Sequence, residues 1–378
     1  MHEKLNRFCC PSYAFTGYCT YSVAAVSAIY NRAYKNGELT YLSKEDLSIW
    51  KKSMLAMLKE YCSVGYNFRI RQVIYTFANS KVEVIRKTAP CSNDNPIVVL
   101  CIKNDLKRIQ MLVNHYRKLG IEKFAFMDNG SDDGTFEWLL DQSDVDLFRC
   151  YEPYQTAVKE GWINRIISHY GFNRWYLVTD SDELGTYVGM ESHPIKDVVK
   201  YAEKSGIKRI KGLTIDMYAD GSPFGNTDDI YGTYKWMDVN TYFEKETVAG
   251  TQKYNCFLGG PRHRLMGSNI NLSKYPLVYF EKGTISDSAH FQYPHTYLAT
   301  SPTYIGILHY KFIDKDLDEY RKRAQDNSGF SSGGLMYKQY MKYIESTGGA
   351  SFIYDESKEF QNSESLRNIE LISGINWE

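Results

Sequence analysis

The sequence predicts an α/β fold in which a mostly parallel sheet carries helices on both faces. Short apolar runs alternate with segments of helical periodicity between residues 97 and 215. Such alternation implies right-handed βαβ units, whose crossover helices cover the sheet. The chain of 378 residues is long enough for a large core and for two or three structural units.

The alternating elements can be assigned in order. The run IVVLCI at 97–102 is a buried strand, and residues 105–119 form an amphipathic helix that stops at Gly120. The elements that follow are a strand at 123–127, a helix at 131–140, a strand at 145–150, a helix at 157–170, a strand ending at Asp180, a helix at 194–203 and a strand at 208–215.

Two segments flank this central part. Residues 1–92, the N-terminal extension, are predicted to be mostly helical, with a helix at 47–61 and a short strand at 81–85. The turn-rich run TAPCSNDNP at 88–96 separates the extension from the rest. The tail, 313–378, is predicted to be helical. Its two amphipathic segments are 317–324 and 335–344, with a flexible-looking break at 328–334 between them.

Composition excludes several classes of protein. Lys and Arg together equal Asp and Glu at 45 each, so no global field attracts nucleic acid or an anionic membrane. The eight cysteines form no C-x-x-C pair, which argues against a zinc site and favours a reducing cytoplasm. The most apolar N-terminal stretch, 21–30, is too short to span a bilayer, and peripheral membrane contact stays open.

The most informative motif is Asp180-Ser181-Asp182, which directly follows the apolar run at 175–178. Alternate side chains of an extended segment share a face, so both carboxylates can reach one divalent ion. Hard oxygen ligands favour Mg²⁺ or Mn²⁺, which usually keep positions open for substrate phosphates. Taken alone, the tripeptide is also common in ordinary turns.

Other polar residues follow the neighbouring strands. The carboxyl ends of parallel strands meet at one edge of a sheet, where ligands of such folds bind. Asp128 can accept a hydrogen bond from a nucleobase, although the segment around it also fits an ordinary strand–turn–helix connection. The residues expected at this edge are Lys103, Asn104, Asp105, Asp128, Glu152, Asp180 and Asp182.

Together these segments resemble the family-2-like glycosyltransferases of GT-A fold, in the group with a K-N-E/D motif and a D-N-x-S-x-D-G-T motif. The resemblance covers roughly residues 95–345 and leaves the N-terminal extension outside. The matching segments are CIKND (101–105), HYRKLGI (115–121), MDNGSDDGT (127–135), WYLVTDSDE (175–183), IDMY (215–218), GGPRHRL (259–265), LSKYPLVYF (272–280), SAHF (288–291) and LHYKF (308–312).

The resemblance implies a nucleotide-sugar donor, usually a UDP-sugar, bound with Mn²⁺ or Mg²⁺. It places the nucleotide in a half at 93–183 and the acceptor in a half at 184–312. Asp128 would hold the base, and Asp180 and Asp182 the ribose and the metal-bound diphosphate. His309 is the matching third metal ligand, with a structural role as the alternative. The further residues expected to contact the donor are Lys103, Asn104, Asp105, Arg262, Arg264 and Lys311.

An inverting transfer also needs a base for the acceptor hydroxyl. We expect Asp216 in this role, because it ends a strand of the matched IDMY segment. Glu183, His290 and Asp287 are the other candidates.

The setting implied by the family is bacterial surface-polysaccharide assembly in the cytoplasm, with peripheral membrane contact open. The acceptor would be a glycan, a lipid-linked sugar or a glycoprotein. The Q-x-x-R-W motif of processive enzymes is absent. A sugar-phosphate nucleotidyltransferase needs a glycine-rich loop after the first strand, and residues 103–107 contain no glycine. A non-catalytic glycan-binding protein is the other alternative.

Overall fold

A computed structural model describes residues 43–62, 67–222, 227–313, 316–325 and 334–377. The apolar stretch at 21–30 and nearly all of the expected break at 328–334 lie outside these residues. Within them, no helix is long and apolar enough to cross a membrane.

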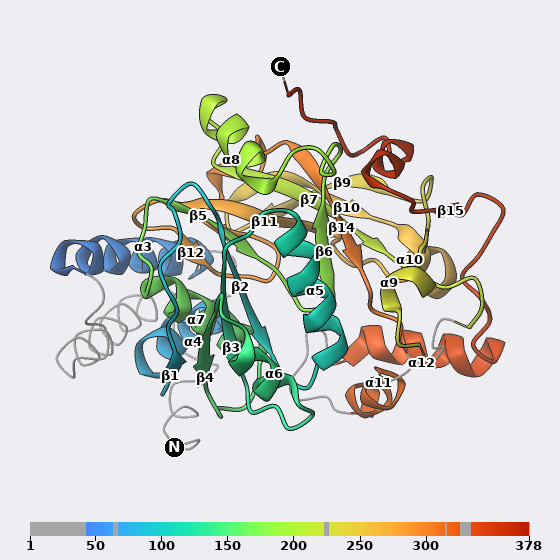
Figure 1. Cartoon of the computed structure of the whole chain (residues 1–378), viewed down its shortest axis with the longest axis horizontal. Coiled ribbons are helices and arrows are strands. Elements are labelled where there is room, and N and C mark those ends of the chain that lie inside the picture. Colours follow the sequence, from blue (N-terminus) through green and yellow to red (C-terminus); the bar gives the residue numbers. More distant parts are fainter. Residues whose placement is uncertain (1–42, 63–66, 223–226, 314–315, 326–333, 378) are drawn as a thin grey trace.

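A nine-stranded sheet forms the centre of the described chain (Figure 1). The pairings give six strands one direction, while β1, β11 and β6 run the opposite way. In spatial order the strands are β1 (Glu83–Arg86), β4 (Val145–Arg149), β3 (Lys123–Asp128), β2 (Ile97–Ile102), β5 (Arg174–Val178), β11 (Ser273–Phe280), β7 (Arg209–Asp216), β14 (Thr303–His309) and β6 (Glu183–Thr186).

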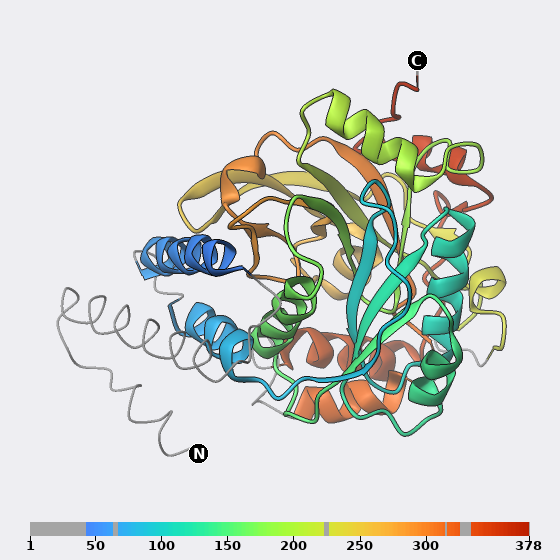
Figure 2. The ribbon, with the colours of Figure 1, turned by 60° about the vertical axis from the view of Figure 1, so that its left-hand side comes forward.

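Helices cover both faces of this sheet, which confirms the predicted fold class (Figures 1 and 2). Helices α5 (Leu106–Lys118), α6 (Thr135–Asp141) and α8 (Ile195–Lys204) pack on one face, and α7 (Thr156–Ser168) packs on the other. Alternate residues of β2 divide between the two cores: Val98 and Leu100 face the first, and Ile97 and Val99 the second. Strands buried on both faces explain the continuous apolar runs in the sequence.

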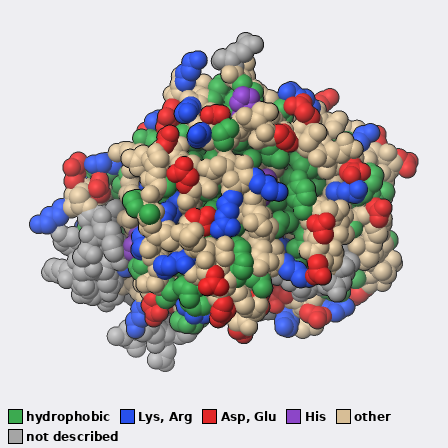
Figure 3. Space-filling model, viewed as in Figure 1, with side chains coloured by type: hydrophobic (Ala, Val, Ile, Leu, Met, Phe, Trp, Pro, Cys, Tyr) green, Lys and Arg blue, Asp and Glu red, His purple; other side chains and the backbone are tan. Residues whose placement is uncertain are grey.

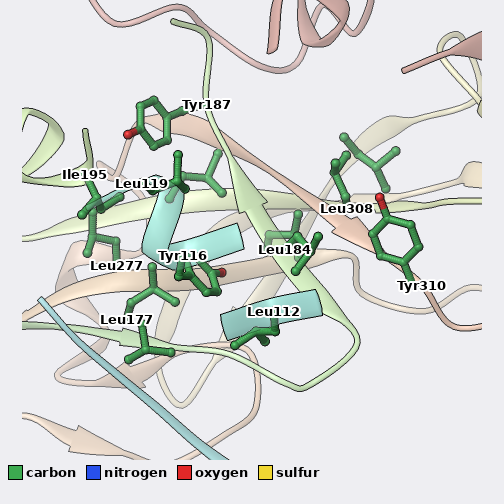
Figure 4. Packing of buried hydrophobic residues seen from close by; sticks show 14 of the residues in the cluster. Leu112, Tyr116, Leu119, Leu177, Leu184, Tyr187, Ile195, Leu277, Leu308 and Tyr310 are labelled. Atoms are coloured by element: carbon green, nitrogen blue, oxygen red, sulfur yellow. The ribbon is translucent and has the colours of Figure 1, made fainter. Parts of the chain in front are cut away.

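The larger core lies between α5, α8 and the sheet. In Figure 4, Leu112 and Tyr116 of α5, and Leu119 directly after it, lie among leucines of the strands, including Leu177 and Leu184. The Tyr116 hydroxyl accepts a hydrogen bond from the backbone N–H of Gly185 at 2.8 Å. This contact fixes α5 against β6, which begins directly after the D-x-D motif.

The region after residue 216 is more regular than the sequence indicates. Strands β11 and β14 enter the main sheet, and β9 (Phe243–Ala249) and β10 (Gln252–Leu258) form a separate hairpin. Strand β11 contains Pro276, which lacks the N–H that a central strand needs. The pairing of β11 with β7 shifts register between Lys274 and Leu277, and this irregularity accommodates the proline.

The N-terminal extension contains α3 (Lys44–Cys62), as expected, and a second helix, α4 (Asn67–Asn79), that was not predicted. Helix α4 lies against α7, which is buried along almost its whole length (Figure 2). The Arg165 guanidinium donates to the carbonyl of Phe77 at 3.2 Å. The extension therefore packs on the central sheet through α7, while the domain boundary at residue 92 stays a prediction.

The tail contributes α11 (Asp316–Gln325) and α12 (Leu335–Thr347), close to the predicted segments. Their tyrosines pack with Tyr218 and Phe312, which follow β7 and β14.

Figure 3 shows basic and acidic side chains interspersed over one face of the molecule, in keeping with the balanced composition. The smaller elements are α9 (Ile230–Thr233), α10 (Gly260–Met266), β8 (Trp236–Met237), β12 (Ile285–Ser286), β13 (Gln292–Tyr293), β15 (Lys358–Glu359) and the 3₁₀ helices His295–Tyr297 and Ser363–Asn368.

Close packing of α4 on α7 gives a stability prediction. A Cβ at Gly161 would lie 2.5 Å from the Thr76 Cβ and 2.9 Å from the Val73 carbonyl oxygen. Gly161→Ala should therefore lower the free energy of unfolding by about 1–3 kcal/mol in urea titrations. The control is Gly221→Ala, at an exposed loop position where no described atom lies within 4 Å of the added Cβ. Equal stabilities of the two variants would contradict the close approach.

Candidate active site

The register of three strands brings the site together. Asp216, the last residue of β7, pairs with His309, the last residue of β14. His309 in turn pairs with Glu183, the first residue of β6. The turn before β6 carries Asp180 and Asp182, and the Glu183 N–H donates to the Asp180 carbonyl at 3.2 Å. Predicted site residues from three separate segments thus share one edge of the sheet.

Asp182, Glu183 and His309 form a group with the character of a metal site. One ligand atom from each lies within 4.8 Å of the other two. The Nε2 atom of His309 lies 3.2 Å from Oδ2 of Asp182, whose side chain is 20% exposed. Two carboxylates and an imidazole suit Mn²⁺, and Mg²⁺ with water completing the shell. These residues therefore fit the expected ion, with Glu183 in the position that the sequence assigned to Asp180.

His309 is held from behind by Asp216. Its Nδ1 atom lies 2.7 Å from Oδ1 of Asp216, and Nε of Arg262 donates to Oδ2 of Asp216 at 2.6 Å. With Nδ1 donating to Asp216, Nε2 is the ring nitrogen that faces Asp182 and that would bind an ion. Burial lowers the pKa of His309, but Asp182 and Asp216 outweigh burial and raise it. An acceptor hydroxyl has no access to Asp216, which is 1% exposed and bonded at both oxygens.

Asp180 contacts two lysines. Its Oδ1 pairs with Nζ of Lys159 from α7, and its Oδ2 lies 2.8 Å from Nζ of Lys274 from β11. Lys274 also lies 2.5 Å from Oε1 of Glu183. Burial raises the pKa of Asp180, but the two ammonium groups outweigh burial and hold it well below its usual value. The two aspartates of the motif thus have different surroundings, one lysine-bound and one beside His309.

The turn after β3 is organised by Asp128. Its carboxylate accepts from the N–H groups of Gly130 at 3.0 Å and Ser131 at 3.1 Å, and it pairs with Arg149 at 3.0 Å. The Asp128 side chain is fully buried, so it shapes the turn from within. The ring of Tyr151 lies against Gly130 and is largely exposed at the same edge.

The loop after β2 is tied to the same turn. Asn104, at a φ of 51°, donates its backbone N–H to Ser131 and bonds Asp132 through its side chain. Asp105 accepts from the Ser181 hydroxyl at 2.5 Å, which links this loop to the D-x-D turn. Lys103 is exposed beside them.

The three cations that the sequence predicted to contact the donor have different partners in the structure. Arg262 is buried against Asp216, and Arg264 pairs with Asp238 at 2.9 Å. Lys311 follows β14, and Asp182 is among the charges that act on it.

The last two candidates for the base differ in access. Asp287 is buried and bonded to Tyr61 and His295, which places it in the contact with α3. His290 is partly exposed, and its Nδ1 lies 2.9 Å from the Ser273 carbonyl oxygen. Burial first, and Lys274 second, lower the pKa of His290 to about 4. The imidazole is therefore neutral at pH 7, with Nδ1–H donating and Nε2 available as an acceptor.

Three residues of this site were not predicted. Lys159 lies on a helix, and Lys274 lies in a strand whose proline obscured its pattern. The guanidinium of Arg108 contacts Asp105, Asp316 and the carbonyls of Tyr310 and Lys311, so it joins the loop after β2 to the tail. Only the matched segment LSKYPLVYF gave a signal for any of them, at Lys274.

Comparisons with known proteins give distant structural similarity alone. No protein-family model matches the chain, and no curated protein matches it. A mannosyltransferase from Pyrobaculum calidifontis in complex with GDP-Man and Mn²⁺ is 13% identical with a TM-score of 0.25, over 45% of this chain and 47% of its own. Residues 1–349 of S. aureus TarS are 12% identical with a TM-score of 0.28, over 67% and 72%.

HddC from Yersinia pseudotuberculosis is 15% identical with a TM-score of 0.27, over 58% of this chain and 89% of its own. The chain spans about half the length of the mannosyltransferase. Similarity at this level says nothing about the reaction, so the function has to be argued from the side chains at the site.

The support of His309 by Asp216 can be tested through metal affinity. Asp216→Asn should weaken Mn²⁺ binding about 10- to 100-fold in calorimetric titrations, because loss of a carboxylate behind a histidine ligand has effects of that size. The matched control is Asp238→Asn, which also removes a buried charge from an arginine pair. Both variants should lose stability, but only the first should lose metal affinity. Equal Mn²⁺ affinities would show that Asp216 does not orient His309.

Proposed function

We propose that the chain is a metal-dependent glycosyltransferase of GT-A type that moves a sugar from a UDP-sugar to a glycan, lipid-linked or protein-linked acceptor. The observation that carries the proposal is the group Asp182, Glu183 and His309 at the carboxyl edge of a mostly parallel sheet. An oxygen-rich site that is partly open to solvent suits an ion whose remaining positions are taken by phosphate oxygens.

The residues have separable roles in this reaction. Asp182, His309 and Glu183 would hold Mn²⁺ or Mg²⁺, and Asp216 would fix the histidine. The bound ion would supply positive charge for the leaving diphosphate. Asp128 and Asn104 would shape the nucleotide-side turns, with Asp128 acting through the backbone it organises.

The base requires an accessible atom with a lone pair. Asp216 is enclosed, and Glu183 is paired with Lys274. His290 presents Nε2 with its tautomer fixed by Ser273, and both Lys274 and Asp180 act on its charge. We therefore assign deprotonation of the acceptor hydroxyl, with inversion at the sugar, to His290.

The donor can be tested by calorimetry with UDP in the presence and absence of Mn²⁺. Wild type should bind UDP only with Mn²⁺, and Asp182→Ala should weaken this binding at least about 10-fold, because the ion bridges protein and diphosphate. The control Asp197→Ala changes a carboxylate on α8, away from this edge of the sheet. Metal-independent UDP binding, or none, would contradict the proposal.

A turnover screen separates the remaining classes. Release of UDP from a UDP-sugar supports transfer. Pyrophosphate release from a nucleoside triphosphate and a sugar phosphate would instead show a nucleotidyltransferase. Glycan binding without turnover of any donor would show a binding protein.

The base can be tested by substitution and by pH. His290→Asn should keep UDP affinity and lower kcat about 10²- to 10⁴-fold. A base with a pKa of about 4 is unprotonated above that value, so the wild-type rate should fall only as the pH drops towards 4. Turnover retained by His290→Asn would move the role to another group, and a midpoint near 6.5 on the acid side would show that the pKa of the base is not lowered.

A further inference from the structure

Two lysines from different elements of the fold contact the same carboxylate at the site. Lys159 comes from α7, Lys274 comes from β11, and Asp180 bridges them. Both lysine side chains are largely buried, while the Asp180 side chain is 29% exposed. The lysine–aspartate–lysine group therefore meets solvent at its centre, beside the metal ligands of the same turn.

The ammonium groups retain hydrogen-bonding capacity. An ammonium has three N–H donors. Lys274 directs contacts to Asp180 at 2.8 Å and Glu183 at 2.5 Å, and Lys159 directs one to Asp180. These contacts leave donors on both lysines for a further acceptor, and a phosphate oxygen is a strong one.

The charges at the site also require an anion once an ion is bound. Among the groups in direct contact, Asp180, Asp182, Glu183 and Asp216 carry four negative charges, and Lys159, Lys274 and Arg262 carry three positive ones. A divalent ion beside a neutral His309 turns the excess negative charge into an excess positive one. A diphosphate compensates for that excess, whereas a neutral ligand does not.

The arginines expected to bind phosphate are engaged elsewhere. Arg262 bonds Asp216 and lies near the Tyr340 hydroxyl, and Arg264 makes two contacts with Asp238 and one with the Phe352 carbonyl. Release of either arginine would take the ion-pair partner from a buried aspartate, which is costly. Lys159 and Lys274 share an aspartate that is already partly exposed.

We propose that Lys159 and Lys274 form the diphosphate-binding half of the site, with Asp180 positioning the two ammonium groups rather than binding the ion. Lys274 has a second effect, because its contact with Glu183 places a positive charge against a metal ligand and weakens metal binding in the absence of the donor. The proposal rests on the proposed function for the identity of the donor, but its chemistry needs only a diphosphate.

The experiment measures metal and anion binding separately by calorimetry, on wild type, Lys274→Met and Lys274→Arg. The probes are Mn²⁺ alone, then inorganic pyrophosphate and UDP at saturating Mn²⁺. Lys274→Met should bind Mn²⁺ about three- to tenfold more tightly, because a repelling charge is removed. It should bind pyrophosphate and UDP about 10- to 100-fold more weakly, because charged hydrogen bonds are lost. Lys274→Arg should restore most of the anion affinity.

The matched control is Lys208→Met, a lysine over the Tyr279 ring, which should change neither affinity. Unchanged pyrophosphate affinity in Lys274→Met would overturn the proposal. So would a parallel loss of Mn²⁺ and anion affinity, since Lys274 would then only hold the carboxylates in place. If wild type binds pyrophosphate with Mn²⁺ but does not bind UDP, the lysine site stands and the UDP-sugar function fails.

Discussion

The site depends on one chain of contacts, from Arg262 through Asp216 and His309 to Asp182. The sheet fixes its geometry, because β7 and β14 pair Asp216 with His309 and β6 places Glu183 on the other side. A buried carboxylate behind the imidazole determines which ring nitrogen carries the proton. Burial raises the pKa of Asp216, but Arg262 and His309 together outweigh burial and lower it, so the carboxylate stays charged. Loss of the Arg262 guanidinium would leave the buried Asp216 carboxylate without its cationic partner.

The two aspartates of the D-x-D motif have different roles because their surroundings differ. Asp182 lies beside His309 and near Glu183, a set suited to an ion. Asp180, two residues earlier, lies between two ammonium groups. The lysines come from α7, which packs on one face of the sheet, and from β11, the strand beside β5, so the two roles depend on these elements rather than on the motif itself.

Much of the fold could be predicted from the sequence. Buried parallel strands have continuous apolar runs, such as 97–102, and amphipathic helices have apolar residues at helical spacing. Strand β11 could not be predicted, because Pro276 interrupts its apolar pattern. The strand pairs with β7 only through a shift in register between Lys274 and Leu277. The carboxylates of the site were predictable where they follow a strand end, as at Asp180 and Asp182, whereas His309 was indicated only by the resemblance of the segment LHYKF. The site was not predictable where the role of a side chain depends on a distant residue that it contacts. Nothing in the sequence pairs Arg262 with Asp216, or Lys159 with Asp180.

The most direct measurement is a crystal structure of the protein with Mn²⁺ and UDP, with the ion located by its anomalous scattering. We expect an ion bound by Asp182 and Nε2 of His309, with Nδ1 of His309 still bonded to Asp216 and the diphosphate between the ion and the lysine pair. An ion bound by Asp180 and remote from His309 would contradict it.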